Sequence, residues 1–198
     1  MSPVRLRLPL AVASVLCAAL ALPALAPART GAKHAGARKA AQVACANADL
    51  EPTADNLDEV RAAVLCLHNR DRAAAGLPAL KENAKLRKAA LGHSDDMVSR
   101  RYFDHDEPDG DGMVDRIKRA GYVRPGDAWS LGENIAWGTS DLATAAEIHN
   151  TWMNSAGHRA NILRRSFKEI GIGIVLGTPS VSPAGAGATY TADFGVRR

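Results

Sequence analysis

Aromatic residues are scarce in this sequence: they make up 5% of 198 residues, and no stretch combines them with a high density of lysine and arginine. Proteins that bind nucleic acid usually present such a combination on one face. The sequence also contains no internal repeat, and its length fits one domain with tails. We therefore expect a single globular domain that does not bind nucleic acid.

The motifs of several hydrolase families are also missing. The sequence contains no HExxH of metalloproteases, no GxSxG of α/β-hydrolases and no SxxK of penicillin-binding proteins. These absences argue against those three mechanisms but leave open catalysis by a different set of side chains.

The N-terminal segment predicts export. Arg5 and Arg7 precede an apolar run from Leu8 to Ala26 that holds no charged residue, and small residues follow at Ala26-Pro27-Ala28. This is the pattern of a secretory signal peptide, so we assign residues 1–28 to it and expect a secreted, extracellular protein. The run is nearly long enough to span a bilayer, and a retained membrane anchor is the second interpretation.

Residues 29–44 follow as a basic segment. The stretch RTGAKHAGARK, residues 29–39, has no apolar periodicity and too little hydrophobic surface to fold. We interpret residues 29–44 as a flexible basic tether, which serves as a solubilising linker or makes a weak contact with an anionic wall or membrane surface. The globular domain then occupies residues 45–198, with its core in about 57–196.

Cysteine is nearly absent from this domain. Of the three cysteines in the sequence, Cys17 lies in the predicted signal peptide, which leaves Cys45 and Cys66. An exported protein can hold such a pair as a disulfide, which would tie the segment before the first helix to that helix. The alternative is two free thiols, one of them a nucleophile.

Helical spacing of apolar residues predicts four helices in the domain. We expect them at residues 57–75, 82–101, 113–120 and 141–154, the last of them capped by Ser140. Between the second and the third, YFDHDEPDGDG crowds Asp, Pro and Gly together over residues 102–112 and predicts a long surface loop.

Two strands are expected near the C-terminus. In EIGIGIVLG, residues 169–177, isoleucines alternate with Gly171 and Gly173, so one face is apolar and the other is bare enough for close packing. ATYTADFGV, residues 188–196, alternates in the same way, and the two segments predict an antiparallel hairpin. LGENIAW, residues 131–137, is ambiguous between a strand and a short turn of helix. The sum is an α+β domain in which helices flank a small antiparallel sheet.

Two of the six histidines stand where a loop or a helix start can aim them into a cleft. These are His105, in the acidic loop, and His158, which follows Gly157. The other four are assigned structural or surface roles: His34 in the tether, His68 beside Asn69 in the first helix, His93 in the core and bonded to a backbone carbonyl, and His149 at the surface or half-buried.

Glu133 lies inside the apolar segment LGENIAW. A carboxylate in such surroundings needs a hydrogen bond, an ion pair or a metal ion, because burying it alone is costly. His105 and His158 are the candidate partners, by ion pair or through a shared metal. We also expect the break at Ser155-Ala156-Gly157 to end the preceding helix and to turn His158 towards Glu133 and His105.

Five segments resemble, in their order and spacing, the CAP superfamily in its short bacterial secreted form, also called the SCP-like or Tpx, antigen 5 and PR-1 family. They are LHNRDRAAAGLPAL, YFDH, GENIAWG, WMNSAGHRANIL and EIGIGIV. The resemblance covers about residues 57–196. It implies a three-layer α-β-α sandwich with a central cleft lined by two histidines and two acidic residues, which in some members hold zinc or another divalent cation.

Carried onto this sequence, the resemblance makes His105 and His158 the two cleft histidines and candidate metal ligands, and Glu133 the first acidic residue. Ser155 stands where long eukaryotic members have the second glutamate. Glu147 lies two turns back on the same helix and is a poor substitute. We expect either a site for zinc or another divalent cation, or a hydrogen-bonded polar cluster without metal.

Three functions follow from this residue set. The leading one is a secreted binding module whose cleft of His105, Glu133, Ser155 and His158 recognises a small ligand, a lipid or a cell-envelope component. The second is a hydrolase of peptides or cell-wall polymers with Glu133 and His158 as catalytic base and acid. The third is a structural or interaction module in which the polar cluster only holds the fold.

Overall fold

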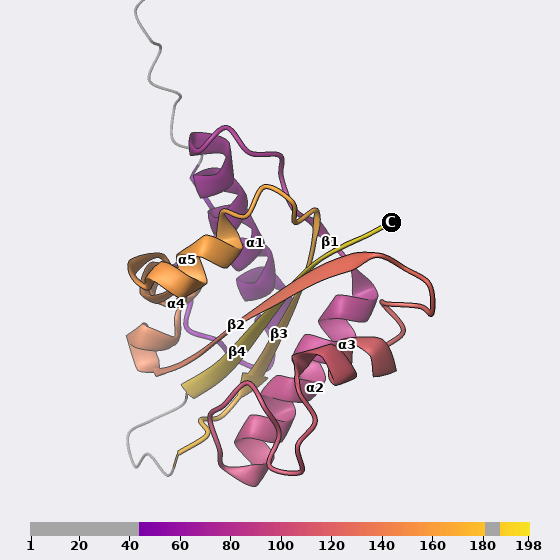
Figure 1. Ribbon diagram of the computed structural model, residues 1–198. Helices are drawn as coiled ribbons and strands as arrows, with labels where there is room; N and C mark the ends of the chain where they lie inside the picture. The colour runs from indigo at the N-terminus through magenta and orange to yellow at the C-terminus, as the bar shows by residue number, and fades with distance from the viewer. Residues whose placement is uncertain (1–43, 181–186) are drawn as a thin grey trace, which may run out of the picture. The chain divides into compact units, whose positions relative to one another are not determined.

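The structure is a computed structural model that describes residues 44–180 and 187–198 (Figure 1). The predicted signal peptide and nearly all of the predicted tether lie outside the described residues. The helices are α1 (Leu57–Ala74), α2 (Ala84–Arg100), α3 (Met113–Arg119), the 3-10 helix η1 (Ser140–Ala143), α4 (Ala145–Asn154) and α5 (Ala156–Ile162). The strands are β1 (Lys81–Glu82), β2 (Trp129–Thr139), β3 (Glu169–Leu176) and β4 (Gly187–Arg197).

The four strands form one sheet in the order β1-β3-β4-β2. The hairpin expected from the alternating residues near the C-terminus is confirmed, because β3 and β4 pair antiparallel. The ambiguous segment LGENIAW is part of strand β2, which pairs antiparallel with the other side of β4. The two-residue strand β1 adds a parallel pair with β3. Strand β2 therefore forms one edge of the sheet.

Helices cover both faces of this sheet (Figure 1). Helix α2 packs on the bare face of β3, where a Cβ added to Gly171 would lie 2.0 Å from the Arg87 nitrogen and one added to Gly173 would lie 2.3 Å from the Ala90 carbonyl carbon. On the opposite face, β3 and β4 bury apolar side chains against α1 and α4, in a core that includes Val64, Trp152, Ile172, Tyr190 and Phe194. The predicted α+β fold with three α-β-α layers is confirmed.

The prediction of one helix from residue 141, capped by Ser140, is wrong. Residues Ser140–Ala143 form the 3-10 helix η1, and Ser140 itself has a positive φ of 51°. The extended backbone of Thr144 then interrupts the helical conformation. The Thr144 hydroxyl accepts a hydrogen bond from the Glu147 amide at 3.3 Å. Threonine is a favoured N-cap, so helix α4 begins after Thr144 instead.

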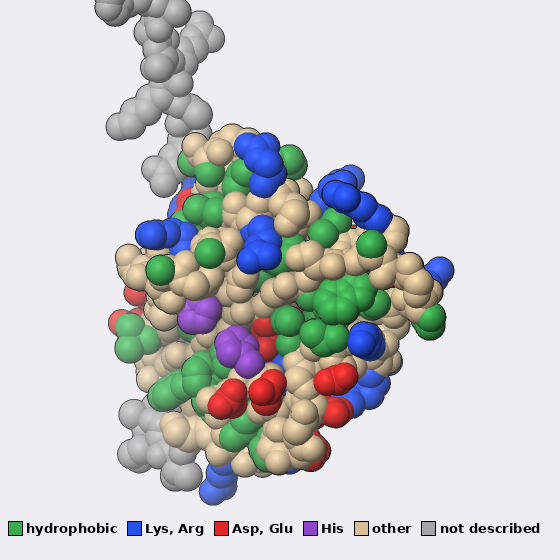
Figure 2. Space-filling view, viewed as in Figure 1, with side chains coloured by type: hydrophobic (Ala, Val, Ile, Leu, Met, Phe, Trp, Pro, Cys, Tyr) green, Lys and Arg blue, Asp and Glu red, His purple; other side chains and the backbone are tan. Residues whose placement is uncertain are grey.

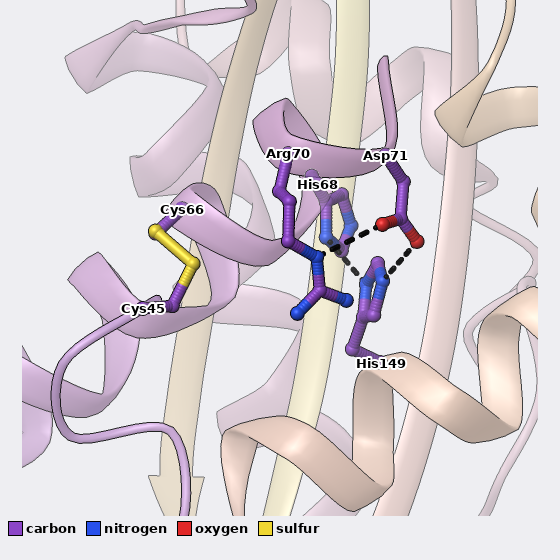
Figure 3. Close-up of a disulfide and its surroundings, with 6 residues drawn as sticks. All are labelled: Cys45, Cys66, His68, Arg70, Asp71 and His149. Carbon is purple, nitrogen blue, oxygen red and sulfur yellow. Dashed lines mark hydrogen bonds and ion pairs between the residues drawn. A yellow bond between two sulfur atoms is a disulfide. The ribbon is translucent and has the colours of Figure 1, made fainter. Parts of the chain in front are cut away.

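The disulfide between Cys45 and Cys66 is confirmed (Figure 3). Cys66 lies on α1, so the bond ties the N-terminal segment to that helix. The Ala146 amide also donates to the Ala48 carbonyl at 2.9 Å, which attaches the same segment to α4. The disulfide excludes the alternative of two free thiols.

Close to the disulfide, His68 and His149 form a buried pair between α1 and α4 (Figure 3). Their Nδ1 atoms are 3.1 Å apart, and His149 Nε2 lies 2.8 Å from an Asp71 carboxylate oxygen. The expectation that His149 lies at the surface or half-buried is wrong, since it is 1% exposed. Burial lowers the pKa of His149 below its usual value. Burial, together with repulsion between the two rings when both are protonated, lowers the pKa of His68 well below its usual value.

Candidate functional site

Glu133 is the centre of a polar cluster on the edge strand β2. Its side chain is 2% exposed and accepts two hydrogen bonds from Arg116 Nη2, at 3.0 and 2.8 Å. Its Oε1 also lies 2.8 Å from His105 Nδ1. A buried carboxylate needs a partner, and the sequence correctly indicated His105 as one partner of Glu133. It did not indicate Arg116, which lies on α3.

The protonation states of this cluster follow from its contacts. Burial opposes ionisation of Glu133, but the hydrogen bond from His105 and the charge of Arg116 outweigh it, and the pKa of Glu133 lies below its usual value. Glu133 is therefore ionised at neutral pH. The hydrogen bond to this carboxylate raises the pKa of His105, whose side chain is 50% exposed. The exposed imidazole thus favours its cationic form.

Asp193 is a second carboxyl group beside Glu133 that the sequence reasoning missed. Its residue on β4 is the register partner of Glu133 on β2. Asp193 is fully buried, and neither of its carboxyl oxygens has a hydrogen-bond partner within the described residues. Burial and the negative charge of Glu133 raise its pKa well above the usual value, which favours the protonated form of Asp193.

His93 closes the cluster on its buried side. Its Nε2 lies 3.0 Å from the Asp104 carbonyl oxygen, as expected for a core histidine, and 3.9 Å from Glu133 Oε1. Burial lowers its pKa, so the ring is neutral and donates to the carbonyl. This bond anchors the loop of residues 101–112, which carries His105, to α2.

His158 reaches the site from the other side of β2. Helix α4 ends at Asn154, and α5 begins at Ala156 after an extended Ser155. The predicted helix break is confirmed, although Gly157 and His158 already lie inside α5.

Two asparagines fasten α5 to β2 at this corner. Asn134 Nδ2 donates to the His158 carbonyl at 3.0 Å, and Asn161 Nδ2 donates to the Glu133 carbonyl at 3.1 Å. These bonds place the backbone of His158 beside the strand that carries Glu133.

The imidazole of His158 is close enough to His105 to feel its charge, but His158 makes no ion pair with Glu133 in the described part of the chain. Its Nδ1 is buried without a hydrogen-bond partner there. Burial lowers its pKa, and the positive charge of His105 lowers it further. The site therefore presents one imidazole that favours the cation and one that favours the neutral form.

A groove of about 440 Å³ opens beside this cluster. Its lining comes from the acidic loop, the start of α3 and β2: His105, Asp106, Gly112, Met113, Val114, Asp115 and Glu133. Ser155 is half-buried at the α4–α5 corner and, like His158, does not line this groove. Figure 2 shows two accessible histidines next to each other, with acidic side chains nearby. The other histidines of the described residues, His68, His93 and His149, are buried.

The donors fit a divalent cation only in part. Glu133 occupies Nδ1 of His105 and leaves its Nε2 available, as in many carboxylate-oriented metal ligands. Both oxygens of Glu133 are engaged by Arg116. Within residues 44–180 and 187–198, no group of three or more His, Cys, Asp or Glu side chains is placed to hold a metal ion. Two imidazoles remain, fewer than the three protein ligands of a usual catalytic zinc site.

Comparison with known sequences supports a family assignment. Residues 65–191 match the sequence profile of CAP, the cysteine-rich secretory protein family. The Bacillus subtilis protein YkwD is 39% identical over 112 residues, which cover 57% of this chain and 41% of YkwD. The Bacillus subtilis membrane protein YlbC is 34% identical over 111 residues, which cover 56% of this chain and 30% of YlbC. The chain thus spans less than half of the length of these curated relatives.

Solved structures agree with this assignment. An extracellular protein containing an SCP domain from Bacillus anthracis superposes with a TM-score of 0.53 at 28% identity, over 73% of this chain and 44% of that one. An outer surface protein of Borrelia burgdorferi gives 0.57 at 18% identity, over 75% of this chain and 97% of that one, and shows the fold alone. The profile match, the fold and the five sequence segments lead to one conclusion: the chain belongs to the CAP family of cysteine-rich secretory proteins.

Proposed function

We propose that this protein is an extracellular binding module in which the groove beside β2, lined by His105, and the neighbouring His158 together bind a small ligand, a lipid or a cell-envelope component. The predicted signal peptide and the extracellular description of the Bacillus anthracis relative support an extracellular location. Among the described helices, none has the length and apolar composition to cross a bilayer.

The observation that carries this proposal is the support given to His105. The imidazole is half-exposed, yet its Nδ1 is fixed at 2.8 Å by a carboxylate that is itself held by a buried arginine. A side chain held in this way loses little further conformational entropy when it binds a ligand. A cationic His105 beside a neutral His158 favours a ligand with an anionic or hydrogen-bond-accepting group. Met113 and Val114 in the groove would contact an apolar part of the same ligand.

A divalent cation such as zinc would be held by the Nε2 atoms of His105 and His158, with water or the ligand completing its coordination. When bound, the ion would supply a positive charge for an anionic ligand group. Both imidazoles must be neutral to coordinate it, so the affinity would rise with pH.

The test combines binding and stability measurements on wild type, His105→Ala and His158→Ala. The control is His34→Ala, which removes an imidazole from the predicted tether. Zinc binding is followed by calorimetry, and ligand binding by pull-down from cell-envelope fractions. We expect both site variants to lose binding at least tenfold while the control binds as wild type. Unchanged binding, with a lower melting temperature in both site variants, would overturn the proposal in favour of a purely structural cluster.

The position of Glu133 does not favour the alternative of a hydrolase. That reaction would need Glu133 to take a proton from water or substrate, but its side chain is 2% exposed and both oxygens accept hydrogen bonds from Arg116. No feature of the described residues favours a particular hydrolysed bond.

A further inference from the structure

Outside the histidine groove, a set of cations surrounds one end of the sheet. There the chain enters β1 and β3 and leaves β4. Four cations rim a pocket of about 380 Å³: Lys81, Arg165, Lys168 and Arg197. Pro78, Ala79, Phe167 and Val196 form its apolar lining. This combination provides positive charge around a small apolar depression.

Within the described residues, the cations at this end of the sheet are not paired with carboxylates. Within residues 44–180 and 187–198, none of the four lies within 4.0 Å of an acidic oxygen, whereas Arg100 and Arg119 pair with the acidic loop. The pocket contains a single acidic residue, Glu169. Its oxygens accept hydrogen bonds from Asn83 at 2.8 Å and from the Tyr122 hydroxyl at 2.7 Å. The positive charge at this end is therefore largely uncompensated.

The backbone holds the cations together. The Lys81 amide donates to the Lys168 carbonyl at 3.0 Å, and the Lys168 amide donates to the Gly195 carbonyl at 3.1 Å. Arg197 donates from Nη1 to the Tyr122 carbonyl at 3.0 Å, and its guanidinium lies 4.9 Å from the centre of the Tyr122 ring. Lys81, Lys168 and Arg197 are thus held by hydrogen bonds to the rest of the fold, and Arg165 lies on the loop that joins α5 to β3.

An exposed tryptophan adjoins the cations. Trp129 is the register partner of Arg197 and is 41% exposed, and the Lys118 ammonium lies 5.9 Å from the centre of its ring. Figure 2 shows lysine and arginine side chains around the loop that joins α5 to β3, away from the acidic side chains beside the histidines. Tryptophan favours the interface of a bilayer, and lysine and arginine are attracted to anionic headgroups.

We propose that this region, which we call the basic sheet end (Lys81, Trp129, Arg165, Lys168 and Arg197), docks on a bilayer that carries anionic phospholipids. The headgroup phosphates pair with these cations, which have no carboxylate partner in the described residues, and Trp129 enters the interfacial layer. The docking surface is separate from the groove of His105, so ligand binding there does not require it. None of its residues belongs to the predicted tether, whose cations would add to the attraction.

The test is sedimentation with vesicles of phosphatidylglycerol and phosphatidylcholine in equal parts, using the full secreted chain. Arg165→Gln/Lys168→Gln removes two exposed cations, each of which contributes about fivefold to binding at an anionic surface. We expect this variant to bind about thirtyfold more weakly than wild type. The matched control, Lys88→Gln/Arg101→Gln, removes two exposed cations elsewhere and is expected to bind within about twofold of wild type.

Two single variants separate membrane docking from binding through the groove. Trp129→Ser should weaken vesicle binding, and His105→Ala should leave it unchanged even if the groove loses its ligand. Equal binding by wild type and Arg165→Gln/Lys168→Gln would overturn the proposal and assign the affinity to the tether. Binding of a soluble glycerol-phosphate polymer without sedimentation on vesicles would also overturn it, because the phosphate partner would then not be a membrane.

Discussion

Arg116 on α3 and Glu133 on β2 form a buried ion pair in which one guanidinium nitrogen lies 3.0 and 2.8 Å from the two carboxylate oxygens. The side chains are 3% and 2% exposed. The pair joins the helix to the edge strand and sets the position of His105. An unpaired charge at either position would have little access to water.

Replacing Arg116 with methionine should therefore destabilise the protein by about 3–5 kcal/mol, because it leaves the Glu133 carboxylate buried without its main partner. Urea unfolding at neutral pH measures this loss. The double variant Arg116→Met/Glu133→Gln removes both charges and should recover most of the stability. A loss below about 1 kcal/mol in the single variant would contradict the importance given to the pair.

Asp193→Asn should stabilise the protein, and increasingly so as pH rises. The raised pKa of Asp193 means that the folded state keeps a proton that the unfolded state releases above about pH 4. Wild-type stability therefore falls with rising pH between the unfolded and the folded pKa, by up to about 1.4 kcal/mol per pH unit. An asparagine side chain has nearly the same shape as the protonated Asp193 side chain and has no carboxyl proton to lose. Unfolding free energies of both proteins from pH 5 to 8 test this, and parallel curves would show that Asp193 is ionised in the fold.

Acid should weaken the contact between α1 and α4. The lowered pKa values of His68 and His149 mean that these rings are neutral in the fold and take up protons on unfolding below about pH 6.5. Each ring then costs up to about 1.4 kcal/mol of stability per pH unit as pH falls. His68→Gln should have a shallower fall in unfolding free energy from pH 6.5 to 5. If its slope matches that of wild type, the pair does not govern the acid response.

Two glycines near α2 should respond to alanine in opposite directions. A Cβ on Gly173 would lie 2.3 Å from the Ala90 carbonyl carbon, so Gly173→Ala should cost at least about 1–3 kcal/mol by forcing α2 from the sheet. A Cβ on Gly92, within α2, meets no atom within 4 Å. Gly92→Ala should stabilise the helix by about 0.5–1 kcal/mol. Thermal unfolding of both variants measures these effects. Equal shifts in melting temperature would refute the close packing of α2 on β3.

Local patterns in the sequence predict most of the fold. Apolar spacing locates α1, α2 and α3 to within a few residues, and alternation in EIGIGIVLG predicts both the strand and the close approach of a helix to its glycines. The start of α4 is missed because Ser140 and Thr144 are both acceptable caps, and only the folded backbone decides between them.

The candidate site is predicted less completely. The cost of burying Glu133 leads to His105, but no local pattern links Glu133 to Arg116, which lies 17 residues earlier on α3. Asp193 is also missed, because only the pairing of β2 with β4 brings it beside Glu133. A signal for the burial of His149 did exist. It adjoins Ile148 and precedes Trp152 by three positions, so it falls on the buried stripe of α4.

The corner between α4 and α5 also protects the free edge of the sheet. An edge strand exposes backbone groups that can recruit a strand from another molecule. Two carbonyl groups of β2 accept hydrogen bonds from this corner. The Trp152 indole donates to the Ile135 carbonyl at 3.0 Å, and Asn161 Nδ2 donates to the Glu133 carbonyl at 3.1 Å. The corner that presents His158 therefore discourages edge-to-edge self-association, and damage to Trp152 or Asn161 would expose the chain to aggregation as well as disturb the groove.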